Sequence, residues 1–346
     1  MRRETGPEYV ELHCHSSYSF LDGASLPEEL AARAVELGYR ALALTDHDGV
    51  YGSLEFAHAA KSLGLRPITG AEVTLAGTAT GHERQPRSLH VTLLVESARG
   101  YANLCRILTE SHAGTRQAGR EDREPLPPSV GPAFVEEHAE GLVCLSGCAR
   151  DGLAVHDAKG TARLAQAFGP DRFHVELQRP FSRGDTRRNR MLRDLAERLG
   201  VTTVATGNVH AHAARRALLQ DTLVAIRCRT SLDGCEEERR GNRESVLAGA
   251  AEMAERLAPL GREAIRRTAE VAERLEFDLT RELGYRYPDF AGGGEPAIAQ
   301  LAGICAHAFE ERYPPRDPVL ADRARARLQS ELALIDELGL AGFFLL

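Results

Sequence analysis

The sequence predicts an α/β fold with a closed, barrel-like sheet, followed by a mostly helical segment. Between Tyr9 and His212, seven short apolar runs alternate with patterns typical of amphipathic helices. Strands separated by helices indicate parallel β/α units. Seven such runs favour a barrel over a dinucleotide-binding fold, and no GxGxxG motif follows the first run. After His212 the apolar residues follow a helical period.

The predicted elements follow one another regularly up to His212. The first run, residues 10–15, is typical of a strand. A helix follows, because Ser25 and Glu28 have the spacing of a capping box and Gly38 ends the apolar period after Leu37. Further strands are predicted at residues 41–45, 68–75, 89–95, 142–146, 173–177 and 201–206, and further helices at residues 53–63, 99–112 and 187–199.

The part after His212 is predicted to be helical. Helices are expected at residues 215–227, 248–257, 262–276, 297–312 and 317–338, joined by a charged loop at 233–244 and a glycine-rich linker at 291–295. Residues 340–346 are apolar, and large apolar side chains at a chain end would face water. We therefore expect this chain to continue as part of a longer protein.

Length and composition exclude several classes of protein. The 346 residues suffice for two domains. The 43 basic and 50 acidic side chains give a net charge of −7, which excludes a basic, histone-like DNA binder. No apolar run approaches the roughly 18 residues that span a bilayer, and the start lacks the apolar core of a signal peptide. The seven cysteines form no CxxC pair, unlike a secreted disulfide framework. These features predict a cytoplasmic protein.

The motif His13-Cys14-His15 is the first sign of chemistry. On a strand, residues i and i+2 face the same side, so both imidazoles can meet one ion. Alone, the motif fits two surface histidines as well as two ligands. Other ligand-type residues follow at or near the ends of later strands: Asp22, His47, Glu72, His90, Cys148, Asn208 and His210.

These positions predict a metal site. The ends of strands in a β/α barrel are where such folds build active sites. Imidazoles, carboxylates and a thiolate suit Zn, Mn or Fe better than Mg or Ca. The candidates exceed the four ligands of one zinc, which implies two or three ions and the machinery of phosphoester hydrolysis. Cys148 can also be an inert thiol, and Asp46 and Asp48 are either partners that orient His47 or turn residues.

Together these motifs resemble a known family, the polymerase and histidinol phosphatase (PHP) domain. The resemblance rests on Leu12-His13-Cys14-His15-Ser16, Ser19-Phe20-Leu21-Asp22-Gly23-Ala24, Leu44-Thr45-Asp46-His47-Asp48-Gly49 and Gly70-Ala71-Glu72. It is closest to the N-terminal domain of bacterial C-family DNA polymerases, the DNA polymerase III alpha subunit type. The Cys of His-Cys-His-Ser, the Asp-Gly-x-Tyr-Gly at residues 48–52 and the ending Asn-Val-His are similar to the error-prone branch. The resemblance implies a distorted (β/α)7 barrel.

The resemblance also implies a set of nine metal-site positions that binds Zn or Mn, with two to three ions. They fall on His13, His15, Asp22, His47, Glu72, His90, Cys148, Asn208 and His210. The family usually has Asp-x-His where this chain has Asn208-Val209-His210. An amide oxygen is a weaker ligand than a carboxylate, so the resemblance leaves open whether the domain is structural or acts as a weak phosphoesterase or 3′–5′ exonuclease. No catalytic residue is separable from the ligands.

Residues 331–339, with Gly342-Phe343-Phe344-Leu345, resemble the lead into the polymerase palm. This implies a parent DNA-directed DNA polymerase, a nucleotidyltransferase whose Asp cluster holds Mg beyond Leu346. The error-prone branch implies DNA repair and translesion replication after DNA damage, in the SOS response. The implied partners are DNA, dNTPs and, outside this segment, a sliding clamp and other translesion factors, with no membrane.

The resemblance divides the chain into four parts. These are an N-terminal tail at 1–8, the PHP domain at 9–212, a helical connector at 213–290 and the truncated start of the catalytic module at 291–346. An alternative is a stand-alone PHP phosphoesterase of the histidinol-phosphatase type, although residues 211–346 are then an unneeded extension. A third is a binding scaffold that holds no metal.

Overall fold

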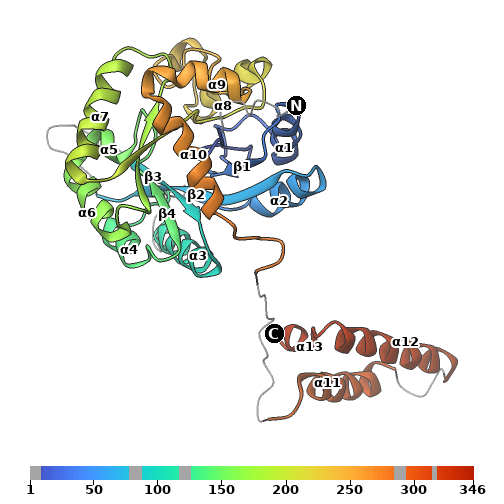
Figure 1. Ribbon diagram of the computed structural model, residues 1–346. Coiled ribbons are helices and arrows are strands. Elements are labelled where there is room, and N and C mark those ends of the chain that lie inside the picture. Colours follow the sequence, from blue (N-terminus) through green and yellow to red (C-terminus); the bar gives the residue numbers. More distant parts are fainter. Residues whose placement is uncertain (1–8, 78–87, 117–125, 284–293, 314–317) are drawn as a thin grey trace, which may run out of the picture. The chain divides into compact units, whose positions relative to one another are not determined.

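The computed structural model describes residues 9–77, 88–116, 126–283, 294–313 and 318–346 (Figure 1). It divides into two compact units, Met1–Leu283 and Gly284–Leu346. The predicted tail at 1–8 and the predicted boundary between residues 290 and 291 lie outside the described residues. The other predicted domain boundary, at His212, remains a prediction.

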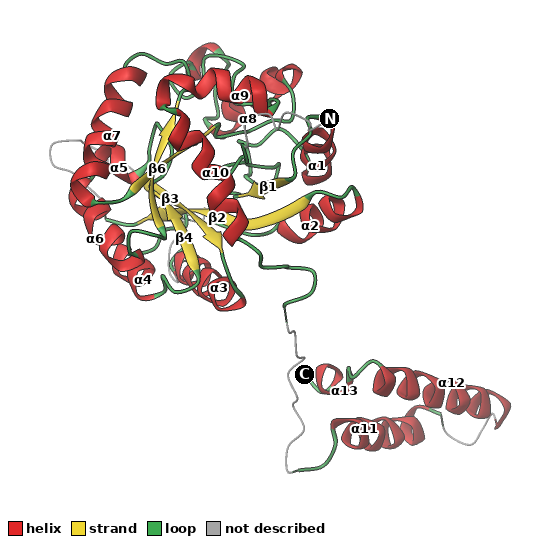
Figure 2. Cartoon of the chain, in the orientation of Figure 1, coloured by secondary structure: helices red, strands yellow, loops and turns green. Residues whose placement is uncertain are grey.

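A six-stranded sheet forms the centre of the first unit, in the order β1-β2-β3-β4-β5-β6. The strands are β1 (Ala41–Leu44), β2 (Arg66–Leu75), β3 (Leu89–Val95), β4 (Leu142–Leu145), β5 (Phe173–Gln178) and β6 (Thr202–Thr206). Strands β1, β3, β4 and β5 are buried at every residue, because helices cover the outside of the sheet (Figure 2). Long apolar runs are typical of strands buried on both faces.

The prediction of uniformly parallel units is wrong at β3. The pairs β1–β2, β4–β5 and β5–β6 are parallel, whereas β3 is antiparallel to both β2 and β4. The connection at residues 76–88 carries no predicted helix. Antiparallel neighbours need no helical crossover, so β3 can return directly alongside β2.

The first predicted strand, residues 10–15, forms only isolated bridges. The sheet therefore has six strands, whereas the sequence predicts seven. Glu11 pairs with Leu42 of β1, and Cys14 pairs with Val209 beyond β6. A regular ladder fails because side-chain oxygens take up backbone amides: the amide of Cys14 donates to Thr45 Oγ1 over 3.0 Å. The segment still links the two ends of the sheet. The predicted α/β class with a distorted barrel is therefore confirmed.

Helices surround this sheet (Figure 2). They are α1 (Pro27–Glu36), α2 (Ser53–Ser62), α3 (Ala98–Ala113), α4 (Pro132–Glu137), α5 (Leu153–His156), α6 (Ala158–Phe168) and α7 (Asp185–Leu199). The predicted cap of the first helix is wrong by one residue. Helix α1 begins after Leu26, whose amide donates to Glu29 Oε2, while Ser25 Oγ instead accepts from the amide of His212.

The chain after β6 continues to pack on the barrel. It forms η1 (Ala214–Arg216), α8 (Ala217–Arg227), η2 (Asp233–Cys235), α9 (Ala250–Leu257), η3 (Ala258–Leu260) and α10 (Arg262–Arg274). Val271 and Ala272 of α10 share one buried apolar cluster with Leu12 and residues of β1, β2, β3, β4 and β6. This cluster joins α10 to the barrel in one compact unit.

The second unit consists of helices. These are α11 (Ala297–Arg312), α12 (Pro318–Glu337) and α13 (Ala341–Phe344), and α11 packs against both of the others. The predicted helices at 297–312 and 317–338 are confirmed over their described residues. Across the described ranges of both units, none of the helices is long and apolar enough to cross a membrane.

Candidate metal centre

His13 and His15 lie side by side on the segment that joins the ends of the sheet. Both are fully buried, and their ring centroids are 4.9 Å apart. Cys14 between them belongs to the apolar core. The two-residue period therefore places both imidazoles on one side even though the segment is not a regular strand.

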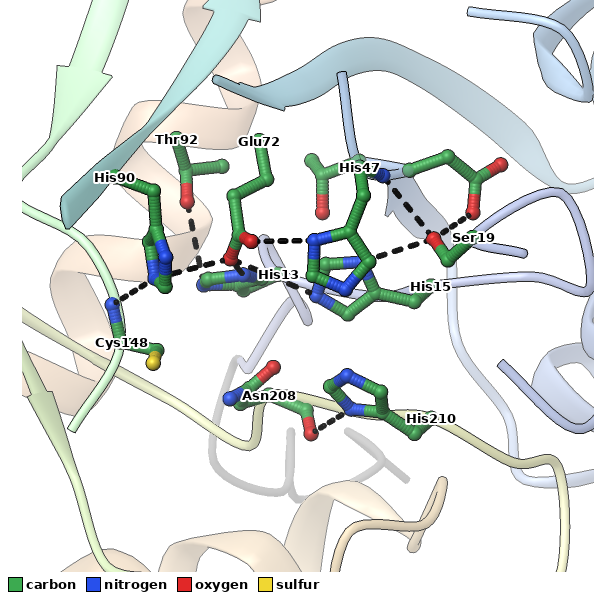
Figure 3. A network of polar contacts seen from close by, with 12 residues as sticks. His13, His15, Ser19, His47, Glu72, His90, Thr92, Cys148, Asn208 and His210 are labelled. Atoms are coloured by element: carbon green, nitrogen blue, oxygen red, sulfur yellow. Dashed lines mark hydrogen bonds and ion pairs between the residues drawn. The ribbon is translucent and has the colours of Figure 1, made fainter. Parts of the chain in front are cut away.

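Glu72 of β2 stands among several imidazoles (Figure 3). Its Oε2 is 3.0 Å from Nε2 of His13 and 3.1 Å from Nε2 of His90 on β3. Its Oε1 is 2.5 Å from Nδ1 of His47, which follows β1. His15 Nε2 lies 4.0 Å from the same carboxylate. Glu72 thus joins residues from three different strand ends.

Electrostatics at this carboxylate favour positive charge. Burial works to raise the pKa of Glu72, but His90 and His47 outweigh it and hold the pKa well below its usual range. Burial likewise opposes charge on His13, yet Glu176 and Glu72 raise the pKa of His13 to about 10. Metal binding requires these imidazoles to be neutral, and the ion then supplies the positive charge that stabilises Glu72.

A second group of imidazoles adjoins the first. The ring centroid of His15 is 4.4 Å from that of His47 and 4.2 Å from that of His210. Asp22 Oδ2 lies 3.1 Å from His47 Nε2 and 3.2 Å from His210 Nε2. The ligand residues form two sets, and within each set the ligand atoms lie within 4.8 Å of one another. One set is His13, His15 and Glu72, and the other is His15, His47 and His210. His15 belongs to both sets.

Two buried atoms support a fit to metal ions. Among the residues that the structure describes, the Nε2 of His15 and the Oδ1 of Asn208 have no hydrogen-bond partner. A buried polar atom without a partner costs about 1–3 kcal/mol, so such atoms indicate a missing ligand. Imidazole nitrogens with carboxylate and amide oxygens suit Zn, Mn or Fe. The residues present therefore fit the predicted ions.

Cys148 lies beside His90, on the loop that follows β4. Its amide is 3.1 Å from His90 Nε2, and its side chain is buried. Burial raises the pKa of the Cys148 thiol, but His90 outweighs burial and lowers that pKa overall. Gly147 has φ +91°, and a Cβ there would lie 2.2 Å from the His90 carbonyl oxygen, so the loop requires glycine. Cys148 is outside both sets of closely spaced ligand atoms.

Asn208 has a left-handed backbone, with φ +49°. Asn and Asp adopt this conformation more readily than other residues with a side chain. The Asn208 carbonyl accepts a hydrogen bond of 3.0 Å from Nδ1 of His210. This bond leaves the Nε2 lone pair of His210 free to face the site. All nine predicted residues thus gather at one end of the sheet.

Sequence reasoning missed two charged residues of this site. Glu176 Oε1 lies 2.7 Å from Nδ1 of His13 and orients that ring from behind. A glutamate inside the apolar run of β5 is the signal that could have found it. Arg240 lies with Nη2 3.2 Å from Asp22 Oδ2 and also contacts His210 Nε2. Nothing in the sequence of the charged loop at 233–244 distinguishes Arg240 from the other arginines there.

Asp46 and Asp48 hold the backbone around the site. Asp46 accepts hydrogen bonds from the amide of Ser16 over 2.6 Å and from Ser19 Oγ over 2.7 Å. Asp48 accepts two bonds of 2.8 Å from Thr74. Asp46 and Asp48 are expected from the sequence either to orient His47 or to be turn residues, and these contacts favour turn residues.

Comparisons with known proteins identify a family for part of this chain. Residues 11–180 match the family model described as the PHP domain. Error-prone DNA polymerase from Symbiobacterium thermophilum is 35% identical over 357 residues, covering 98% of this chain and 31% of that protein. Error-prone DNA polymerase from Mycobacterium tuberculosis is 37% identical over 345 residues, covering 97% and 31%. This chain therefore spans under a third of these relatives.

A solved structure is also similar. It is that of a candidate metal-dependent phosphoesterase from Bifidobacterium adolescentis, with a TM-score of 0.44 and 16% identity. The match covers 59% of this chain and 89% of that one.

Proposed function

Because this chain contains a PHP domain, over residues 11–180, we propose that it is the N-terminal part of an error-prone DNA polymerase and that its PHP domain binds two or three ions of Zn or Mn. The relatives that match 97–98% of the chain are error-prone DNA polymerases. On this proposal the longer protein synthesises DNA in repair and translesion replication, in the cytoplasm. Its Mg ions, dNTPs, sliding clamp and other translesion factors bind outside this chain.

The observation that carries the metal proposal is the buried Nε2 of His15, which has no hydrogen-bond partner within the described ranges and belongs to both sets of ligand residues. His13, His15 and Glu72 would hold one ion, and His47, His210 and Asp22 would hold another; the single lone pair of His15 Nε2 can serve only one of the two. The remaining proposed ligands are His90, Cys148 and Asn208. A bound transition metal polarises a phosphoryl oxygen and lowers the pKa of a bound water.

We assign the domain a mainly structural role, with weak phosphoesterase or 3′–5′ exonuclease activity at most. Asn208 offers a neutral oxygen where the family usually has a carboxylate. A neutral ligand binds a divalent ion less tightly. The chain's own residues nevertheless orient the ligands: Glu176 fixes the ring of His13, and the Asn208 carbonyl fixes that of His210.

Elemental analysis of the purified chain tests the metal site. After dialysis against metal-free buffer, the protein is expected to retain Zn or Mn at two to three ions per chain. Removing the metal with a chelator should lower the melting temperature, because a ligand present at 100 times its Kd adds about 2.7 kcal/mol of stability. A protein that retains no transition metal, and whose melting no added metal shifts, would contradict the proposal.

Primer extension tests the polymerase assignment. The longer gene product is expected to extend a primer on a DNA template with dNTPs and Mg, whereas residues 1–346 alone are not. The physical reason is that the proposed Asp cluster for nucleotidyl transfer lies beyond Leu346. Templated incorporation by residues 1–346, or none by the longer protein, would overturn the assignment.

The alternative is a phosphoesterase of the histidinol-phosphatase type that acts on a small phosphate monoester. A cavity of 310 Å³ beside Asn208, lined by Arg150, Arg239 and Arg240, favours it, because arginines suit an anion. Rapid, metal-dependent release of phosphate from p-nitrophenyl phosphate by the chain would support this alternative over a structural domain.

A further inference from the structure

Arg240 brings a fixed positive charge to the site. Its Nη2 lies 3.2 Å from Asp22 Oδ2 and also contacts Nε2 of His210. The Arg240 side chain is 22% exposed, whereas those of Asp22 and His210 are 10% and 1% exposed. Arg227 adds a second guanidinium 3.7 Å from Asp22 Oδ1. The guanidinium therefore contacts two of the proposed metal ligands.

The two atoms that Arg240 contacts are those that a metal ion would take. A guanidinium has donors only, so His210 Nε2 must offer its lone pair to it. The bond from His210 Nδ1 to the Asn208 carbonyl leaves Nε2 in that state. Asp22 Oδ2 is likewise an acceptor. Arginine and a divalent cation thus require the same lone pairs.

The other set of ligand atoms lacks such a contact. His13, His15 and Glu72 contact one another, and they also contact Glu176, His47, His90 and hydroxyl or amide side chains. Within the part of the chain that the structure describes, none of the hydrogen bonds and ion pairs of these three residues involves an arginine. Among the described residues, competition with an arginine is therefore specific to the Asp22–His210 position.

The loop that carries Arg240 is attached to the barrel on both sides of this residue. Before it, Arg150 donates to the carbonyls of Glu237 and Glu238 over 2.6 and 2.9 Å. After it, Asn242 Nδ2 donates to the carbonyl of Pro180 over 2.7 Å. These contacts hold Arg240 at the edge of the 310 Å³ cavity that it helps to line.

We propose that Arg240 is an internal cation that competes with a metal ion for the Asp22–His210 position. This inference rests on the proposed metal-binding function and adds a control on how many ions the domain holds. Since both cations require the same lone pairs, a metal ion at this position displaces the Arg240 side chain, while the contacts of Arg150 and Asn242 keep its loop attached.

Calorimetric titration of residues 1–346 with MnCl₂ tests the competition. We expect Arg240→Gln and Arg240→Ala to bind one ion about tenfold more tightly than the wild type, because a charge-assisted contact no longer opposes it. Arg239→Gln is the matched control. It removes the same charge from the same loop, but Arg239 pairs with Asp221 outside the ligand set, so its affinity should equal that of the wild type.

A second measurement uses the wild-type chain and needs no variant. Adding MnCl₂ should increase trypsin cleavage after Arg240 relative to cleavage after Arg239 and Arg243, because the displaced Arg240 side chain becomes accessible to the protease. No change at this bond would overturn the proposal, as would equal affinity of the wild type and both Arg240 variants. If Arg239→Gln gained as much affinity for Mn as the Arg240 variants, the effect would come from the net charge of the loop, and the proposal would be overturned as well. Absence of binding in every protein would overturn the metal site itself, and this inference with it.

Discussion

Replacing Glu72 by glutamine is expected to remove most of the bound metal and to lower the free energy of unfolding by about 3–5 kcal/mol, the usual cost of breaking a buried ion pair. Glu72 is only 3% exposed and lies within 3.1 Å of nitrogens of His13, His47 and His90. Glutamine keeps the shape of the side chain but removes the negative charge. The imidazoles then share a buried position without a counter-charge, and a divalent ion loses its carboxylate ligand.

Elemental analysis and urea unfolding, each with and without added metal, measure both effects of Glu72→Gln. Glu96→Gln is the control, since Glu96 pairs with Arg172 and Arg274 away from the ligand residues. The control should keep the metal content of the wild type and lose about 1 kcal/mol or less. Wild-type metal content in Glu72→Gln would show that this carboxylate is no ligand.

Replacing Asn208 by aspartate is expected to tighten binding of one ion by about tenfold, since a charged oxygen replaces a neutral one. The Oδ1 of Asn208 is buried and has no hydrogen-bond partner in the described part of the chain, so a carboxylate oxygen at this position can bind an ion without losing another contact. Aspartate also tolerates the left-handed backbone at φ +49°, so the fold should be retained. We further expect metal-dependent hydrolysis of p-nitrophenyl phosphate to rise above that of the wild type.

Calorimetry with MnCl₂ and a phosphate-release assay measure these two gains. Gln166→Glu makes the same change from amide to carboxylate at an exposed position on α6, and Gln166 is not a proposed ligand. It should leave metal affinity and hydrolysis unchanged. If Asn208→Asp binds metal no better than Gln166→Glu, position 208 lies outside the coordination sphere.

Periodicity predicted most of the elements because burial of strands and amphipathic helices depends on local residue order. It failed for residues 10–15, where side-chain oxygens such as Thr45 Oγ1 replace backbone partners. It also failed for the direction of β3, since an apolar run has the same pattern in parallel and antiparallel sheets. Both errors concern which distant atoms pair.

The sequence by itself determined the α/β class and the chemical types that gather at the site. His13 and His15 share a side because side chains alternate along an extended segment. Ligand-type residues such as Glu72 can be recognised in the sequence because they are polar residues within apolar runs. Only the tertiary structure decided that Glu176 supports His13 and that Arg240 reaches Asp22 and His210. Residues far apart in the chain meet through the closure of the sheet and the attachment of one loop, and no local pattern encodes those distances.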